Sequence, residues 1–191
     1  MTPSRLRLVS LAAIVAGAGL VSLAWSQPWF ALTISGTVHE VPGAVAGGAL
    51  LPLALASLAL VAALALAGPV FRVILGVLDA LLGVCVVAVS AWALGDPVAA
   101  SLPFLVEETG IGSAEALAGD LTTSAASAWP FVAIVAGALV ILTGVTVAAT
   151  ARAWPASGSR YSRSRLATPE GDAIHDWDAL SEGDDPTAGP R

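Results

Sequence analysis

Four long apolar stretches dominate this chain. They cover residues 8–25, 44–67, 73–94 and 129–151, and a helix needs about 20 apolar residues to cross a bilayer. Each stretch should be helical, because backbone groups in lipid must be hydrogen-bonded within their own segment. Only 12% of all residues are charged, whereas soluble domains carry about 25%. We therefore expect an all-α membrane protein whose residues 1–151 form a bundle of four transmembrane helices.

The first stretch has a second interpretation, as a cleaved signal peptide. Arg5 and Arg7 form a basic segment before it, and the Ala-Trp-Ser sequence at residues 24–26 loosely matches a cleavage site. However, the apolar run is longer than in most signal peptides, and a bulky Trp precedes the cleavage point. We favour an uncleaved span, and cleavage would leave the orientation of the other three unchanged.

The arginines predict the orientation of the bundle. Arg5 and Arg7 precede the first span, and Arg72 lies between the second and the third. The loops at 26–43 and 95–128 contain no Arg and carry six acidic residues. Since positive loops stay on the cytoplasmic side, both termini should lie in the cytoplasm of a cell-membrane protein. Four further arginines, Arg152, Arg160, Arg163 and Arg165, follow the fourth span and agree with this orientation.

Tryptophans mark the ends of the spans. The amphipathic ring of Trp is enriched where a membrane meets water. The predicted interface anchors are Trp25, Trp29, Trp92 and Trp129 on the outer side and Trp154 on the inner side.

Asp79 is the one charged residue well inside a span. It lies between Gly76 and Gly83 in the sequence. Gly76, Gly83 and Ser90 are spaced seven residues apart, so they share one helix face. A face of small residues packs against a neighbouring helix, so the carboxylate should point into the bundle. Intramembrane carboxylates are costly and often functional. A structural role, in which Asp79 is hydrated or meets Arg72, and a role in binding a proton or substrate both remain open.

Small residues recur in the other spans as well. Gly17, Gly47 and Gly137 let helices approach closely. Packing within one bundle is the simplest interpretation, and a homo-oligomer interface is the alternative. Pro52 should kink the second span or lie beside a neighbour that compensates.

The first loop predicts a short β-hairpin on the membrane surface. Phe30, Leu32 and Ile34 alternate with smaller or polar residues, and a Ser-Gly turn and β-branched residues follow. The second loop is longer, and its residues 113–127 are rich in alanine with a weak helical pattern.

Residues 152–191 form a cytoplasmic tail that is first basic and then acidic. Its second part has few large apolar residues, and we expect the tail to be largely disordered. Within it, Ile174, Trp177 and Leu180 recur at three-residue spacing. This pattern indicates a short helix that orders on a cytosolic protein partner. A solvated tail without a partner fits the same residues.

The chain contains no recognisable chemical motif. A lone Cys85 permits neither an internal disulfide nor a cysteine metal site. His39 and Glu40 are neighbours in a predicted strand, so their side chains point to opposite faces. We expect no catalytic, cofactor-binding or metal-binding residue, no nucleic-acid partner and no enzymatic activity.

The tail also carries a family resemblance. Residues 177–180 (WDAL) and 183–187 (GDDPT) resemble the C-terminal signature of the actinobacterial Trp biosynthesis-associated membrane proteins. Residues 27–29 (QPW) and 160–161 (RY) are similar to the same family. Its members are encoded in or beside tryptophan biosynthesis operons, and they offer no catalytic residues to carry over. The resemblance implies a non-enzymatic accessory protein of tryptophan synthesis. The alternative is a small transporter of tryptophan, indole or a precursor.

Overall fold

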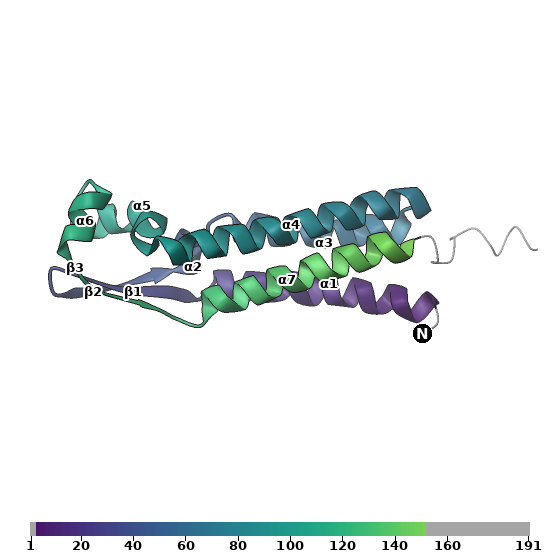
Figure 1. The fold of residues 1–191 in the computed structure, drawn as a ribbon, viewed down its shortest axis with the longest axis horizontal. Coiled ribbons are helices and arrows are strands. Elements are labelled where there is room, and N and C mark those ends of the chain that lie inside the picture. The colour runs from purple at the N-terminus through teal and green to yellow at the C-terminus, as the bar shows by residue number, and fades with distance from the viewer. Residues whose placement is uncertain (1–2, 152–191) are drawn as a thin grey trace, which may run out of the picture. The chain divides into compact units, whose positions relative to one another are not determined.

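The structure, a computed structural model, describes residues 3–151 (Figure 1). The predicted tail, including Trp154, Ile174, Trp177 and Leu180, lies outside the described residues. The elements in chain order are α1 (Pro3–Trp25), β1 (Pro28–Ile34), β2 (Thr37–Pro42), α2 (Gly43–Ala46), α3 (Leu50–Leu66), α4 (Pro69–Gly95), α5 (Pro97–Thr109), α6 (Ala114–Asp120), β3 (Leu121–Ala126) and α7 (Trp129–Thr150).

Three of the described helices are long and apolar enough to cross a membrane: α1, α4 and α7. The segment predicted as the second span is divided. It consists of the short α2, a break at residues 47–49 and the 17-residue α3, which at 1.5 Å per residue is about 26 Å long. The chain breaks at two glycines, before Pro52 rather than at it. Pro52 then occupies the first turn of α3, where a missing backbone N–H costs little.

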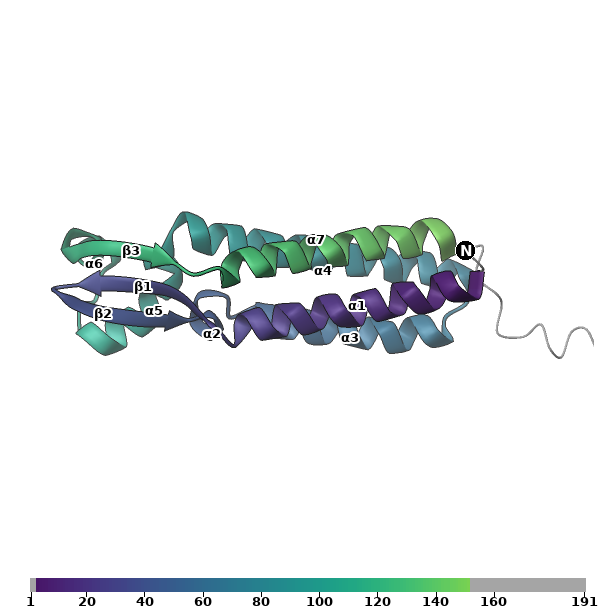
Figure 2. The ribbon, with the colours of Figure 1, turned by 90° about the horizontal axis from the view of Figure 1, so that it is seen from below.

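The four long helices pack side by side, and α4 with α7 forms the most extensive contact (Figure 2). Buried positions recur at alternating intervals of three and four residues, the spacing of helices that remain in contact over many turns. Glycines make this contact close, because they let backbone meet backbone. The positions with this spacing are Arg72, Gly76, Asp79, Gly83, Val86, Ser90 and Ala93 on α4, with Pro130, Ala133, Gly137, Val140, Gly144 and Val147 on α7, where Ala136 and Thr143 are buried as well.

The contact between α4 and α7 bears on whether small residues form a homo-oligomer interface. Gly76 and Gly83 lie against the backbone of α7 in the same chain, at Gly144 and Gly137 respectively. The small-residue face of α4 is therefore used within one bundle. A homo-oligomer would have to use other surfaces.

The predicted hairpin is present, and it is part of a larger cap at one end of the bundle, formed by residues 26–42 and 96–128 with β1, β2, α5, α6 and β3. Ser35 and Gly36 form its two-residue turn with φ of 50° and 83°, as the twist of a tight hairpin requires. The hairpin does not lie across the end of the bundle. Its strands extend away from the helices, and β3 pairs with β1 to give an antiparallel sheet of order β2-β1-β3 (Figures 1 and 2).

The second loop is more structured than its sequence pattern indicated. It forms α5, α6 and β3, and the two helices cover one face of the sheet (Figure 1). The helical pattern expected over residues 113–127 is correct only for α6, because the following residues form β3. The core between helices and sheet is apolar and contains Phe30, Leu32, Ile34, Leu105 and Leu117.

Candidate functional site

The candidate site surrounds Asp79 in the middle of the bundle. Asp79 is 0% exposed and occupies a core position of α4, so its side chain points inward as predicted. The Ser57 hydroxyl of α3 interacts with the carboxylate, and Ser57 is itself only 3% exposed. Neither carboxylate oxygen has a hydrogen-bond partner of good geometry among the described residues. The site is thus a buried carboxyl group with one hydroxyl beside it.

Two buried hydroxyls of the bundle are better satisfied than Asp79. Ser90 donates to the carbonyl of Val86 at 2.9 Å, and Thr143 donates to the carbonyl of Leu139 at 2.9 Å. Hydroxyls can bond to their own helix in this way, whereas a carboxylate has no proton to donate. Asp79, unlike these two hydroxyls, is therefore a buried group with little compensation from its own helix.

Asp79 lies between two separate apolar clusters. The larger cluster extends from the cap into the bundle and ends at Ala54 on α3 and Val86 on α4. The smaller cluster, near the N-terminal end, contains Ile14, Leu64 and Val147. Asp79 and Ser57 belong to neither of them and lie between their levels on α4 and α3. Apolar side chains thus separate the carboxyl group from both ends of the bundle.

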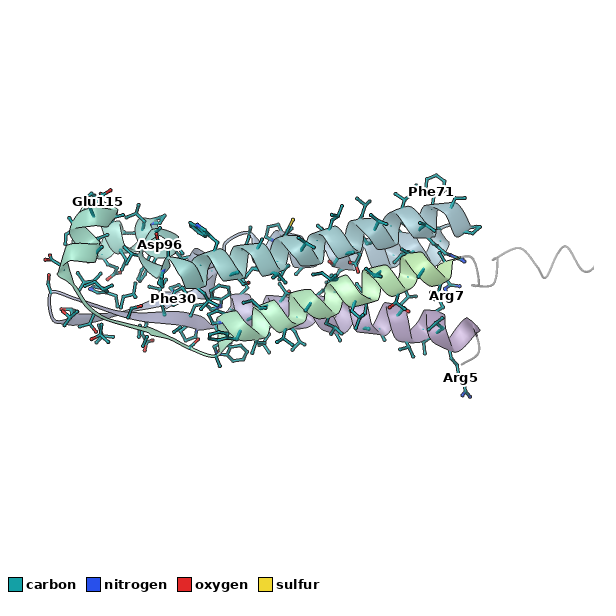
Figure 3. All side chains as sticks on the ribbon, viewed as in Figure 1. Arg5, Arg7, Phe30, Phe71, Asp96 and Glu115 are labelled. Carbon is teal, nitrogen blue, oxygen red and sulfur yellow. The ribbon has the colours of Figure 1, made fainter. Side chains whose placement is uncertain are left out.

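Charged residues divide between the two ends of the described unit. Arg5 and Arg7 lie at the end that carries the N-terminus, and Asp96 and Glu115 lie in the cap (Figure 3). The Arg7 guanidinium donates to the carbonyl of Ala65 at 2.8 Å, which joins α1 to α3. Arg72 is buried at the same end, within electrostatic range of Arg7.

Trp29 differs from its expected role as an interface anchor. Its ring is 0% exposed, and its Nε1 donates to the carbonyl of Ala24 at 2.8 Å. The ring lies against Gly43 and Gly47, beside the break between α2 and α3. Trp29 is therefore a packing residue that connects the cap to the bundle. Of the other expected anchors, Trp92 is 56% exposed, Trp25 and Trp129 are partly buried, and Trp154 lies outside the described residues.

Three hollows lined by described residues lie on the surface. One of about 540 Å³ lies between α4 and α7 and has an apolar lining that includes Val77, Leu81, Ile141 and Val145. Another, of about 230 Å³, lies on the sheet beside Trp29 and Glu40. A third, of about 460 Å³, borders the first turns of α4. Asp79 lines none of these three hollows.

The structure identifies one site residue that sequence reasoning missed. Ser57 was not singled out, although Leu50, Ser57 and Leu64 recur at intervals of seven residues and are all buried. That spacing places a polar residue in the core stripe of α3. It would have indicated that Asp79 faces a hydroxyl. In the described residues no three His, Cys, Asp or Glu side chains gather as metal ligands would.

Comparison with known proteins supplies the family. A model of the tryptophan-associated transmembrane proteins matches residues 11–187, which is most of the chain. No curated protein and no solved structure matches significantly. The match extends from α1 well beyond α7, so it includes both the bundle and most of the tail. The helices described above agree with a membrane-embedded protein surrounded by lipid. The chain therefore belongs to the tryptophan-associated transmembrane protein family.

Proposed function

We propose that this protein is a non-enzymatic accessory of tryptophan biosynthesis in the cell membrane. It spans the membrane four times, with α3 as the short second span, and both termini are in the cytoplasm. Its tail docks a cytosolic partner, an enzyme of tryptophan synthesis, at the inner membrane face. The observation that supports this proposal is that the family match includes residues 11–187, and so most of the tail.

The distribution of charge supports the orientation. In the described residues, Arg5, Arg7 and Arg72 belong to the N-terminal end of the bundle. The cap contains neither Arg nor Lys and carries all of the described acidic residues except Asp79. Positive-inside orientation then places the N-terminal end in the cytoplasm and the cap outside. Since four spans return the chain to its starting side, the tail is cytoplasmic as well.

The family match supports a role for the tail sequence. It continues to Thr187 and so includes the segment 172–187. A tail that only keeps the protein soluble requires a suitable composition, but it does not require a shared order of residues. The matched range includes Trp177 and Leu180, so the positions proposed for docking lie within the part of the tail that the family model describes.

The composition of this segment suits docking better than independent folding. Three large apolar side chains cannot offset the entropy of ordering sixteen residues. Against a groove on a partner, burial of Trp177 and Leu180 stabilises the complex by several kcal/mol, at about 1.5–3 kcal/mol for a large apolar side chain. The six acidic residues of the segment speed the encounter with a basic surface and make it sensitive to salt.

Cross-linking in native membranes tests the docking proposal. We expect the intact protein to capture an enzyme of tryptophan synthesis. The amount of enzyme captured by the Trp177→Ala, Leu180→Ala double variant should be at least about tenfold lower, since 1.4 kcal/mol corresponds to a factor of ten. The matched control replaces polar residues of the same segment, His175→Ala with Ser181→Ala, and should capture normally. Equal recovery with both double variants, or recovery of no such enzyme by the intact protein, contradicts the proposal.

Asp79 supports a second candidate, a small transporter of tryptophan, indole or a precursor. A carboxyl group fully buried between membrane helices is a frequent feature of substrate and proton pathways. The two candidates differ in what they require. Transport needs movement of a solute through the bundle and does not need the tail, so counterflow of labelled tryptophan in proteoliposomes distinguishes them.

A further inference from the structure

We propose that Asp79 is a proton-binding site inside the bundle. Its carboxylate gains one proton, delivered from water, to give the neutral acid, and the same O–H bond breaks when the proton returns to water. The proposal depends on the surroundings of the side chain. It does not depend on the tail or on the docking partner.

The surroundings favour a neutral side chain. A buried carboxylate needs an opposite charge or several hydrogen-bond donors to replace its lost hydration. Asp79 is 0% exposed, and among residues 3–151 the Ser57 hydroxyl is the side chain that interacts with it. Both carboxylate oxygens lack a well-formed hydrogen bond in the described residues. The neutral acid has no such requirement, and its O–H can donate to the Ser57 oxygen.

In the described long helices, the ionisable groups other than Asp79 lie toward one end of the bundle or on its surface. Neither α3 nor α7 contains an ionisable residue. The charged residues of α1 are Arg5 and Arg7, near its start. On α4 itself, Arg72 lies two turns before Asp79, about 10 Å along the helix axis. Cys85, the other titratable group of α4, is exposed on the surface of the bundle.

The packing around Asp79 selects a proton over a larger ligand. On α4, Gly76 and Gly83 lie on either side of Asp79 and are in close contact with the backbone of α7. A metal ion would need several more oxygen ligands, and in the described residues no three His, Cys, Asp or Glu side chains are placed to hold one. An organic cation would need a cavity, and Asp79 lines none of the three hollows described above. A proton requires neither additional ligands nor additional volume.

The same packing encloses the site. Ile14, Leu64 and Val147 separate it from the N-terminal end, and the larger apolar cluster separates it from the cap. Water must therefore enter between helices before the proton can exchange. Of the four pairs of neighbouring long helices, α3 with α4 has the smallest contact. This is also the pair that carries Ser57 and Asp79, so separation of α3 from α4 is the step that opens the site.

Infrared spectroscopy of the full-length protein in lipid nanodiscs tests the proposal. A protonated carboxyl group gives a carbonyl stretching band above the amide I band, and a carboxylate does not. We expect this band at neutral pH, where the exposed Asp and Glu side chains are ionised. It should shift when the protein is made with ¹³C-carboxyl aspartate, which identifies it as an aspartic acid without any mutation.

Variants then assign the band to one residue. Asp79→Asn should remove it, and Asp96→Asn, which changes an exposed carboxylate of the cap, should leave it unchanged. Ser57→Ala should shift its frequency, because the neighbouring hydroxyl is lost. The proposal is overturned if the wild-type protein shows no isotope-sensitive acid band at neutral pH, or if the band persists in Asp79→Asn.

Discussion

Gly144→Val should be among the most destabilising substitutions in the membrane bundle. A Cβ at Gly144 would lie 2.5 Å from the Ala80 nitrogen and 2.6 Å from the Gly76 carbonyl oxygen. Both are backbone atoms, so no side-chain rotation can relieve the contact and the two helices must move apart. Overpacking of this kind costs about 3 kcal/mol. We expect the apparent melting temperature in detergent to fall by roughly 10 °C for a chain of this size.

Gly19 provides the matched control for that experiment. It lies in the interior of α1, and a Cβ there would meet nothing within 4 Å. Gly19→Val should therefore leave the melting temperature within a few degrees of the wild type. If Gly144→Val were equally harmless, the close contact of α4 with α7 would be wrong.

Trp29→Ala should separate the stability of the cap from that of the bundle. The substitution removes a fully buried indole, its hydrogen bond to Ala24 and its contacts with Gly43 and Gly47. Truncation of a buried Trp to Ala costs about 3–5 kcal/mol. Amide hydrogen exchange in β1 and β3 should accelerate on the order of a hundredfold, since each 1.4 kcal/mol is a factor of ten. Exchange in the centre of α7 should change much less.

Two further variants show which property of Trp29 matters. Trp29→Phe keeps an aromatic ring but loses the N–H donor, so it should cost about 1 kcal/mol for the hydrogen bond and a smaller amount for packing. Trp92→Ala removes a ring of the same type that is 56% exposed, and cap exchange should not change. Equal effects of Trp29→Ala and Trp92→Ala would contradict the burial of Trp29.

The parts of this fold that could be predicted depend on local patterns. Apolar length alone indicated the helices that became α1, α4 and α7, because lipid permits few other conformations. The alternation of Phe30, Leu32 and Ile34 before a Ser-Gly turn indicated the hairpin. The seven-residue spacing of Gly76 and Gly83 placed Asp79 on the inner face of α4. Each of these signals lies within one continuous stretch of sequence no longer than a single membrane span.

The parts that could not be predicted depend on distant contacts. β3 has the sequence LTTSAA and is exposed over most of its length, so it shows no apolar alternation of its own. Its partner β1 lies about ninety residues earlier in the chain. The role of Trp29 also depends on a distant contact. In the sequence it resembles an interface anchor, whereas in the fold α2 and the break at residues 47–49 pack against its ring.

The start of α5 also has a local signal in the sequence. Asp96 caps this helix through the Ala99 N–H at 3.0 Å, and Pro97 occupies its first turn. An Asp-Pro pair before an apolar stretch is a common helix start. Gly110, with φ of 72°, ends the same helix.

The central claim, a cap outside the cell and a tail inside it, is tested most directly by single-cysteine labelling in intact cells. Cys85→Ser provides the background, and cysteines are introduced at Val38 and Glu115 in the cap and at Thr168 in the tail. A membrane-impermeant maleimide should label Val38→Cys and Glu115→Cys in intact cells. It should label Thr168→Cys only after the cells are permeabilised. Labelling of Thr168→Cys in intact cells, or protection of both cap positions, would contradict the four-span arrangement with cytoplasmic termini.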